Sequence, residues 1–445
     1  MKTVTLFEYS APERPEDRDR LKKLENRLRR INKVTKATIF EPSWGTVKAR
    51  NYVGIITVGK TTIQILPKLY RKDWEDEDQK SYDKKVEEAT RNLLFMLSFT
   101  KRLKLKEAGL SRLKKERSDL YESIVYLFAK NLLETLKRNY RRDYERRTED
   151  LRFVKGKVVL SRQIRKPVHD RIHCSYFELS EDNMINRILK YTCHLLSSRV
   201  KSRENWLLLQ NILSIFDGVT LVPVRILDFE KIRFNRLNED YEPFINLSRL
   251  FLENMSLELQ SSQFRTFSLL FDMNVLFEEF IGEFLRKHRG DILGDTEFSN
   301  CQIHLQTKRR WLIERPKHSF RLIPDIIFTE DGKNIKLIID TKYKILDSCK
   351  PYFGVSQDDI YQVFAYSKKF KCSKIVLLYP WDERIGDHSK GTGLLNSDHL
   401  PYKFDDQTKL YIATVDLKSG DLRDKNNLEK LRKNLNKLFC KISEL

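Results

Sequence analysis

The 445-residue sequence has few of the features that mark fibrous, disordered or membrane-spanning chains. It contains only 15 glycines and 12 prolines, too few for a collagen-like or low-complexity architecture. No apolar run approaches the ~18 residues that a membrane-spanning helix needs. The stretch from Pro12 to Asp19 is acidic and contains proline, unlike a signal peptide. We therefore expect a cytoplasmic protein without a membrane partner.

Cysteine is scarce and scattered. The six cysteines form no CxxC pair and no cluster with histidine. This spacing argues against a disulfide framework and against a structural zinc site. We expect reduced, mostly buried thiols at all six positions, which are Cys174, Cys193, Cys301, Cys349, Cys372 and Cys440.

Acidic residues are outnumbered, with 63 Asp and Glu against 84 Lys and Arg, which gives a net charge of +21 at pH 7. Residues 1–250 hold 53 basic and 35 acidic residues, a net +18, whereas residues 251–445 hold 31 and 28, a net +3. A basic surface of this kind indicates a polyanionic partner. A surface that only keeps the protein soluble is the alternative, because charge alone says nothing about chemistry.

The hydrophobic pattern predicts an α+β multidomain protein with three segments. Residues 1–80 combine an amphipathic helix at 15–33 with a small β module, because the apolar period changes from helical to two after residue 37. Residues 81–258 are mainly helical, and we expect this region to dock on a partner.

Residues 259–445 are predicted to form an α/β domain. Their apolar segments follow the order α-β-β-β-α-β, which is typical of a mixed sheet flanked by helices. The predicted helices lie at 273–287, 357–370 and 428–439, and the predicted strands at 302–306, 320–328, 335–341, 375–379 and 410–415.

A basic hairpin interrupts the helical middle segment. Short strands at 151–153 and 157–160 flank Gly156 and follow a run of Lys and Arg at 137–142. We predict that this hairpin contacts phosphate groups or an acidic partner surface, although a solvated charged face is the alternative. The basic residues proposed for this role are Arg138, Arg141, Arg142 and Lys155.

The segment from Gly54 to Thr61 satisfies the phosphate-loop pattern G-x-x-x-x-G-K-[ST]. A phosphate loop must follow a strand and open a helix whose N-terminus faces the phosphates. Here the loop positions are Ile-Ile-Thr-Val, and an alternating strand ending at Pro67 follows. The context predicts a β-hairpin turning at Gly59-Lys60, so we expect this chain itself to bind no nucleotide.

The strongest candidate site is built from Asp325, Asp340 and Lys342. Asp340 and Lys342 are two residues apart on a predicted strand, which places both side chains on one face. Asp325 lies on the preceding strand across a tight turn, so the two carboxylates are expected to meet. Such oxygen ligands suit Mg²⁺, and a neighbouring lysine could orient water or offset phosphate charge. The alternative is a surface ion pair.

The order and spacing of these residues resemble those of a known nuclease superfamily. Asp325 followed by Asp340-Thr341-Lys342 on the α-β-β-β-α-β pattern resembles the PD-(D/E)xK nuclease superfamily, with its restriction-endonuclease fold. Longer segments resemble the McrC family, the nuclease subunit of McrBC-type modification-dependent restriction systems. They are FDMNVLFEEF at 271–280, PDI at 324–326, IDTKYK at 339–344 and DIYQVFAY at 359–366.

The resemblance, which spans about 90 to 445, implies a Mg²⁺-dependent DNA endonuclease, with Mn²⁺ able to substitute. It implies a hexameric AAA+ GTPase partner, McrB, that recognises modified cytosine in double-stranded DNA, while the McrC-like chain stimulates GTP hydrolysis and cuts. The family's catalytic residues carry over to Asp325, Asp340 and Lys342, with support from Glu278 and Gln362. Asp325, Asp340 and Glu278 would hold the metal, with Glu279 as the alternative to Glu278.

Two other functions are compatible with parts of the sequence. An adaptor that activates an NTPase ring and binds DNA without cutting it would need no intact catalytic triad, yet Asp325, Asp340 and Lys342 are all present. A free-standing phosphate-loop NTPase depends only on the segment from Gly54 to Thr61.

Overall fold

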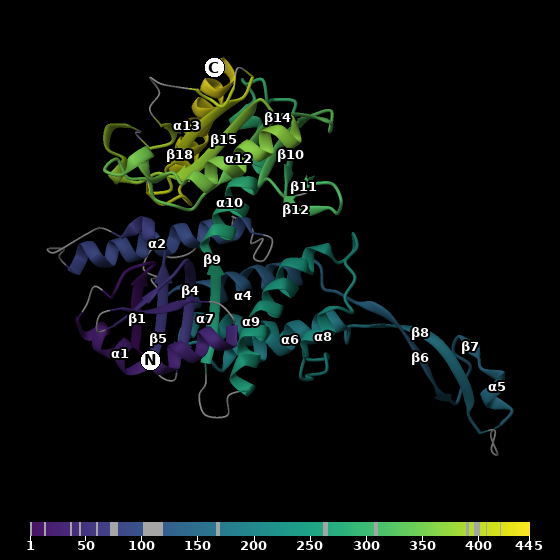
Figure 1. Cartoon of the computed structure of the whole chain (residues 1–445). Helices are drawn as coiled ribbons and strands as arrows, with labels where there is room; N and C mark the ends of the chain where they lie inside the picture. Colours follow the sequence, from purple (N-terminus) through teal and green to yellow (C-terminus); the bar gives the residue numbers. More distant parts are fainter. Residues whose placement is uncertain are drawn as a thin grey trace. The chain divides into compact units, whose positions relative to one another are not determined.

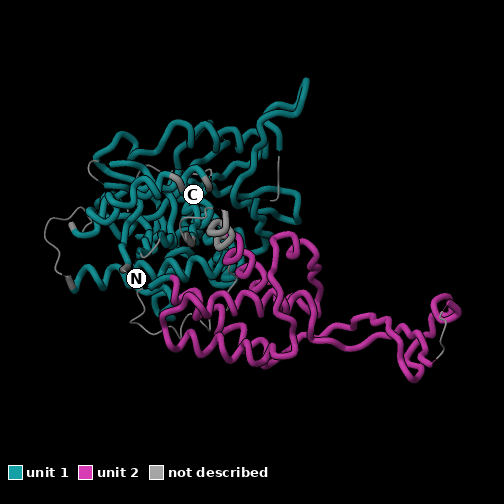
Figure 2. Tube along the Cα trace, turned by 90° about the horizontal axis from the view of Figure 1, so that it is seen from below, with its two compact units in different colours: residues 1–120, 258–445 teal, residues 121–257 magenta. Residues whose placement is uncertain are grey.

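The computed structural model describes residues 2–12, 15–35, 38–43, 46–58, 61–71, 79–100, 119–165, 170–260, 266–306, 310–388, 391–395, 401–405, 407–418 and 420–445. The chain divides into two compact units (Figure 2). Unit 1 joins residues 1–120 to 258–445, and unit 2 comprises residues 121–257. None of the helices in the described ranges combines the length and apolarity needed to cross a bilayer.

The N-terminal part of unit 1 is a four-stranded sheet with the order β1-β5-β4-β9. β1 is parallel to β5, and β4 is antiparallel to both β5 and β9. The helix predicted at 15–33 is present as α1, which packs on the β2–β3 hairpin. These elements are β1 (Lys2–Phe7), α1 (Pro15–Thr35), β2 (Phe40–Ser43), β3 (Thr46–Ala49), β4 (Tyr52–Val58), β5 (Thr61–Leu66) and β9 (Thr266–Asp272).

The phosphate-loop pattern lies on two antiparallel strands. Val58 of β4 pairs with Thr61 of β5, while Gly59 and Lys60 lie outside the described residues. The strand context predicted for this segment is confirmed, because β5 follows where a phosphate loop would open a helix. Gly54 has a packing reason of its own: with φ at +128°, a Cβ there would lie 2.0 Å from the carbonyl oxygen of Leu269 on β9.

The C-terminal part of unit 1 is a mixed sheet with the order β10-β13-β14-β15-β18-β16, with β17 also paired to β18. β10, β13 and β14 are antiparallel, whereas β14, β15 and β18 are parallel. The strands are β10 (Gln302–Leu305), β13 (Ile326–Glu330), β14 (Asn334–Thr341), β15 (Lys374–Pro380), β16 (Gly393–Leu394), β17 (Tyr402–Lys403) and β18 (Lys409–Val415). The predicted mixed α/β composition is confirmed.

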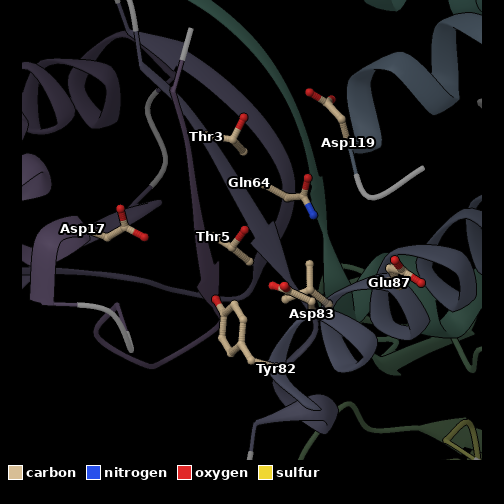
Figure 3. A pocket seen from close by; sticks show the side chains of 9 residues that line it. Thr3, Thr5, Asp17, Gln64, Tyr82, Asp83, Glu87 and Asp119 are labelled. Atoms are coloured by element: carbon tan, nitrogen blue, oxygen red, sulfur yellow. The ribbon is translucent and has the colours of Figure 1, made fainter. Parts of the chain in front are cut away.

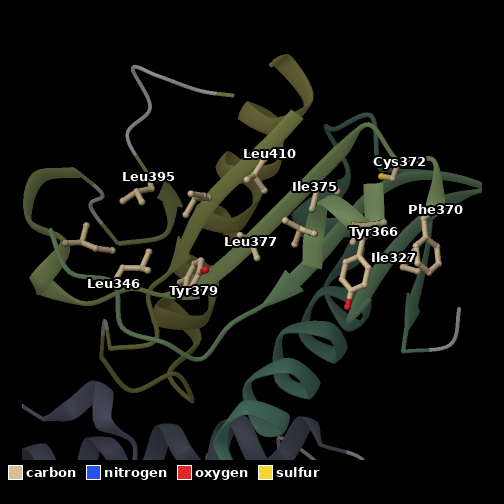
Figure 4. Close-up of a cluster of buried hydrophobic side chains, with 14 residues drawn as sticks. Ile327, Leu346, Tyr366, Phe370, Cys372, Ile375, Leu377, Tyr379, Leu395 and Leu410 are labelled. Atoms are coloured by element: carbon tan, nitrogen blue, oxygen red, sulfur yellow. The ribbon is translucent and has the colours of Figure 1, made fainter. Parts of the chain in front are cut away.

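Helices cover both faces of this sheet. On one face, α12 (Gln357–Phe370) contributes Val363, Tyr366 and Phe370 to a core with the inward side chains of β13, β14 and β15 (Figure 4). On the other face, Phe439 of α13 (Lys425–Glu444) packs on Phe328 of β13, with ring centroids 5.9 Å apart. α10 (Met273–Lys287) lies against β10, where Gly282 meets Leu305, and α11 (Arg289–Leu293) contacts α13.

The strand predicted at 320–328 is wrong, because the chain forms two strands there. β12 (Ser319–Leu322) pairs with β11 (Arg310–Ile313) in a separate hairpin, and β13 begins only at Ile326. Pro324 lacks the N–H that a strand interior needs, and this accounts for the break.

Unit 2 consists of helices and a long β arm (Figure 1). The helices pack through aromatic contacts such as Phe128 of α4 against Phe251 of α9, with ring centroids 5.8 Å apart. The principal helices are α4 (Leu120–Arg138), α6 (Met184–Ser197), α7 (Arg203–Ile215) and α9 (Glu242–Gln260), and shorter helices are α5 (Leu160–Gln163) and α8 (Ile226–Phe229).

The hairpin predicted around Gly156 is wrong in its strand pairing. β6 (Asp143–Leu151) pairs with β8 (Ile172–Ser180) over nine residues, and the short β7 (Lys157–Val158) pairs with β8 instead of β6. The sequence DYERRTEDL of β6 is mostly exposed and has no apolar alternation, so its periodicity could not reveal a strand.

α2 (Gln79–Phe99) contacts β5 and α10 and so belongs to unit 1, although its sequence lies in the segment assigned to the helical middle region. β9 also joins the N-terminal sheet although it follows unit 2 in the chain. The division at 1–80, 81–258 and 259–445 stays a prediction of functional regions.

Candidate active site

The turn between β13 and β14 brings the two predicted catalytic aspartates together. Asp331 and Gly332 have φ values of +49° and +70°, and the tight turn sets the register in which Ile326 pairs with Ile339. Asp325, one residue before β13, therefore lies opposite Asp340 near the end of β14. The backbone N–H and the hydroxyl of Thr341 both donate to Asp325 Oδ2, each at 2.7 Å.

Lys342 lies on the same face as Asp340, as the spacing predicts. Its Nζ is 2.7 Å from Asp340 Oδ2 and donates to Gln362 Oε1 at 2.7 Å. Gln362 Nε2 donates to the hydroxyl of Tyr366 at 2.7 Å, and that hydroxyl donates to the carbonyl of Ile323 at 3.3 Å. The amide and phenol of α12 thus fix the position of the ammonium group.

Glu278 reaches the site from α10, which begins at the cap Asp272. Gln306 connects it to the strands: its side-chain amide donates to Glu278 Oε1, and its backbone N–H donates to the carbonyl of Asp325 at 3.0 Å. Sequence reasoning missed Gln306. The only local signal is a polar residue directly after β10, and its φ of +49° shows that the chain turns there.

A second ion pair, between Lys344 and Asp359, lies beside Lys342. Lys344 Nζ lies 2.7 Å from Asp359 Oδ2, and Lys342 Nζ lies 3.8 Å from Asp359 Oδ1. Burial would raise the pKa of Asp359, but hydrogen bonds from Lys344 and Ser356 outweigh burial and lower it. Asp359 is therefore a permanent anion, and it helps to hold both lysines near the end of β14.

Tyr343, directly after Lys342, connects the site to the N-terminal sheet. Its buried hydroxyl donates to Glu8 Oε2 at 3.1 Å, and Lys68 Nζ donates to its backbone carbonyl at 2.8 Å. Burial, opposed by the charge of Lys68, raises the pKa of Glu8 to about 7. These contacts position the backbone that carries Lys342 and were not predicted from the sequence.

The carboxylates of the site are energetically strained as anions. Burial, followed by the charge of Glu278, raises the pKa of Asp325 to about 7. Burial, followed by the charge of Asp325, raises the pKa of Asp340 to about 7 as well, and burial also raises that of Glu278. Burial would lower the pKa of Lys342, but its interactions with Asp340, Asp359 and Asp325 together outweigh burial and raise the pKa. Excess negative charge thus collects in a buried place, which favours an added cation.

The carboxylate oxygens of the site are suited to a hard divalent cation, although they do not complete its coordination shell. Asp340 is 1% exposed, and its Oδ2 accepts no hydrogen bond, since its approach to Lys342 is an ion pair without hydrogen-bond geometry. Mg²⁺ takes one or two carboxylates and completes its shell with water and phosphate oxygens. Within the described ranges, no three His, Cys, Asp or Glu side chains are grouped closely enough to form a complete metal cage.

A pocket elsewhere in unit 1 has different chemistry. It encloses about 320 Å³ beside β1, β5 and α2, and its lining includes Asp17, Asp83, Glu87 and Asp119 (Figure 3). None of the predicted catalytic residues lines it. Four acids repel a phosphodiester, so this pocket is not suited to the chemistry expected at Asp340 and Lys342.

The four basic residues predicted to bind a partner lie in unit 2. Arg138 forms an ion pair with Asp240 at 2.9 Å, and Lys155 forms one with Glu178 at 3.0 Å. The guanidinium of Arg141 is paired with Asp143 and largely shielded from solvent. Arg142 is exposed, with its guanidinium 5.8 Å from the ring centroid of Tyr140.

The family model of the McrBC 5-methylcytosine restriction system component matches residues 47–380, three quarters of the chain. The chain belongs to the McrBC family. The match includes Glu278, Asp325, Asp340, Lys342 and Gln362, so the whole candidate site lies within the part that defines membership of the McrBC family. No match was found among curated proteins.

Solved McrBC assemblies share the fold. A chain of the refined half-complex from the tetradecameric assembly of Thermococcus gammatolerans McrB AAA+ hexamers with bound McrC is 24% identical, with a TM-score of 0.68. That similarity covers 98% of this chain and 100% of the other. The cryo-EM structure of the T. gammatolerans McrBC complex is 29% identical over 65% of this chain and 88% of the other, with a TM-score of 0.52.

Proposed function

We propose that this chain is the DNA-cutting subunit of a GTP-dependent restriction complex, an endodeoxyribonuclease of the PD-(D/E)xK type. The observation that carries the proposal is the position of Asp340 and Lys342, two residues apart at the end of β14, with Asp325 opposite them. A partly buried lysine between carboxylates, held by Gln362, is suited to binding a scissile phosphate.

The chain's own residues would divide the chemistry among them. Asp325 and Asp340, with Glu278 behind them, would hold Mg²⁺, or Mn²⁺ in its place, and the bound ion would supply Lewis-acid activation of phosphate and water. Lys342, with its raised pKa, stays protonated at neutral pH and stabilises the charge that develops on the phosphate. Gln362 and Asp359 keep that ammonium group in place, which removes the cost of orienting it during the reaction.

The partner that we propose is a McrB-type AAA+ GTPase hexamer. In the T. gammatolerans assembly, McrC is bound to McrB AAA+ hexamers, and this supports the same arrangement here. We further propose that unit 2 stimulates GTP hydrolysis and that the partner selects double-stranded DNA containing modified cytosine. The exposed Arg142 could bind phosphate or carboxylate groups of that partner.

Reconstitution with a McrB-type GTPase tests this function. The full chain should form a complex with the hexamer, raise its rate of GTP hydrolysis, and cut 5-methylcytosine-containing duplex DNA only when GTP and Mg²⁺ are both present. The same duplex without modification is the matched control and should stay intact. A complex that stimulates GTP hydrolysis yet cuts neither substrate with Mg²⁺ or Mn²⁺ would make the chain a non-cutting activator.

A further inference from the structure

The β11–β12 hairpin interrupts the candidate site in the sequence and lies beside it in the structure. It is an insertion between Gln306, which directly follows β10, and Asp325, which precedes β13. Its strands pair from Arg310 with Leu322 to Ile313 with Ser319, and it is separate from the main sheet (Figure 1). Two residues of the site, Gln306 and Asp325, therefore flank the hairpin in the sequence.

The hairpin packs on α12, the helix whose Gln362 contacts Lys342. The guanidinium of Arg310 lies over the ring of Phe370 at 5.6 Å, and Lys369 forms an ion pair with Glu314 at 3.3 Å. Near the base of the hairpin, the carbonyl of Ile323 accepts a hydrogen bond from Tyr366, the same tyrosine that is bonded to Gln362. Since α12 covers the face of β14 that carries Lys342, the hairpin emerges on the site's face of the sheet.

Positive charge dominates the described part of the hairpin. Arg310, Arg315, Lys317 and Arg321 are all exposed, and the single acid, Glu314, is already paired with Lys369. Residues 251–445 carry a net charge of only +3, so this local excess is not a general property of that half of the chain. Concentrated cations on an exposed hairpin fit a polyanion.

An exposed aromatic ring accompanies these cations. Phe320 is 69% exposed and has a φ of +56°, a left-handed conformation that costs a non-glycine residue about 1 kcal/mol or more. Nearby, Trp311 is stacked on His318 at 5.8 Å and lies under the guanidinium of Arg321 at 5.2 Å. An apolar ring held outward among cations matches the wedges that proteins place against base steps.

We propose that the β11–β12 hairpin is a DNA-binding element that grips duplex DNA beside the scissile phosphate. Arg315, Lys317 and Arg321 contact backbone phosphates, and Phe320 packs against the bases of the adjoining groove. The inference deepens the proposed nuclease function and rests on it for the position of the scissile phosphate. Binding itself requires no cleavage, so it can be measured independently.

The charge contribution is tested by the double variant Arg315→Glu/Lys317→Glu in the full chain. Binding to a 30-base-pair duplex is measured by fluorescence anisotropy over a salt series, with Ca²⁺ in place of Mg²⁺ to prevent cleavage. We expect at least a tenfold weaker affinity and a salt slope reduced by about 2, because each phosphate contact contributes roughly 0.9 to the slope. Phosphate contacts are not sequence-specific, so unmodified and modified duplexes should lose affinity alike.

The matched control is Lys430→Glu/Lys437→Glu, which changes the charge equally on the exposed side of α13. α13 packs on the opposite face of the sheet through Phe439, so its reversal should change affinity less than threefold. Equal loss in both double variants would show a general charge effect and overturn the proposal. Unchanged DNA binding by the hairpin variant would also overturn the proposal. If that variant bound the GTPase more weakly, the hairpin would be a protein-docking surface.

The ring is tested separately by Phe320→Ala, with Phe320→Tyr as the conservative variant. Because the ring carries no charge, Phe320→Ala should leave the salt slope unchanged, lower affinity several-fold and slow cleavage in the reconstituted complex, while Phe320→Tyr restores both. Wild-type affinity and cleavage in Phe320→Ala would contradict a wedge. If wild-type protein binds duplex through the hairpin yet never cuts, the nuclease proposal fails and the binding surface stands.

Discussion

Thr341 donates both its backbone N–H and its hydroxyl to Asp325 Oδ2, each at 2.7 Å. Because Thr341 lies between Asp340 and Lys342, this pair of hydrogen bonds couples the position of Asp325 to the other two catalytic candidates. The two acids cannot move apart without breaking contacts in a buried place, where an unpartnered polar group costs about 1–3 kcal/mol. The geometry of the site is therefore set in advance of any substrate or metal.

Thr341→Val should slow cleavage about tenfold, because it removes the hydroxyl contact while the backbone contact keeps the fold. Thr414→Val is the matched control: Thr414 is a buried threonine of β18 in the same sheet, and its hydroxyl donates to the carbonyl of Gly391 at 2.7 Å. Both variants should lose ~1 kcal/mol of unfolding free energy. Only Thr341→Val should lose activity, and a similar rate in both would contradict the coupling.

Gln362→Ala should lower the cleavage rate by about 10- to 100-fold, as removing outer-shell partners commonly does. Gln362 touches Lys342 and not the expected position of the substrate, so kcat should fall more than the affinity for DNA. Gln357→Ala removes an exposed amide of the same helix, one that contacts Tyr361, and should leave the rate unchanged. Steady-state cleavage by the reconstituted complex gives both values. A loss confined to DNA affinity would argue against a positioning role.

The carboxylates predict how stability depends on pH without metal. An acid whose folded pKa is raised contributes stability that is present below its unfolded pKa and is lost as pH rises through the folded value. For Asp340 that window runs from 3.8 to about 7. In EDTA at pH 8, Asp340→Asn should therefore be more stable than the wild type by on the order of 1 kcal/mol. Below pH 4 this advantage should disappear.

Thermal unfolding from pH 4 to 8.5 with EDTA, repeated with Mg²⁺, measures this difference. Mg²⁺ should stabilise the wild type at pH 8 and not Asp340→Asn, because a ligand of the folded state raises apparent stability by mass action. A less stable Asp340→Asn protein in EDTA at pH 8 would contradict this prediction, because it would show that the buried Asp340 carboxylate does not destabilise the fold.

Arg142→Glu should reduce stimulation of GTP hydrolysis about tenfold in the absence of DNA, since it reverses an exposed charge suited to phosphate or carboxylate groups. Arg203→Glu reverses an equally exposed charge at the start of α7 and should leave stimulation intact. Arg141 is less informative, because its guanidinium is engaged with Asp143. Full stimulation by Arg142→Glu would identify the basic run as a solvated face.

The strand that carries the candidate site was predictable because its pattern is local. The apolar residues of β14 run up to Asp340, with Lys342 directly after the strand, and the turn residues before β14 bring Asp325 back beside it. The spacing of two therefore predicts the shared face, and the 2.7 Å ion pair confirms it. The absence of a nucleotide site at Lys60 stays a prediction, although the strand context that motivates it is confirmed.

Contacts between distant segments could not be predicted in the same way. Gln306 reaches Glu278 across 28 residues, and Tyr343 reaches Glu8 across 335, so no periodicity relates them. β9 completes the N-terminal sheet although it follows unit 2 in the sequence, and β6 is so polar that its pattern resembles a loop. Local spacing determines which side chains share a face, whereas tertiary packing determines what they touch.

We propose that Asp340 acts in DNA cleavage by this chain and not in activation of its partner. The most direct test is Asp340→Ala in the complex with a McrB-type GTPase, with cleavage of methylated duplex and GTP hydrolysis measured in the same reaction. We predict that cleavage falls by at least ~1,000-fold, as loss of an essential catalytic group does, while assembly and stimulated GTP hydrolysis stay within twofold of wild type. Wild-type cleavage by a folded, assembled Asp340→Ala complex at ordinary Mg²⁺ would contradict the assignment.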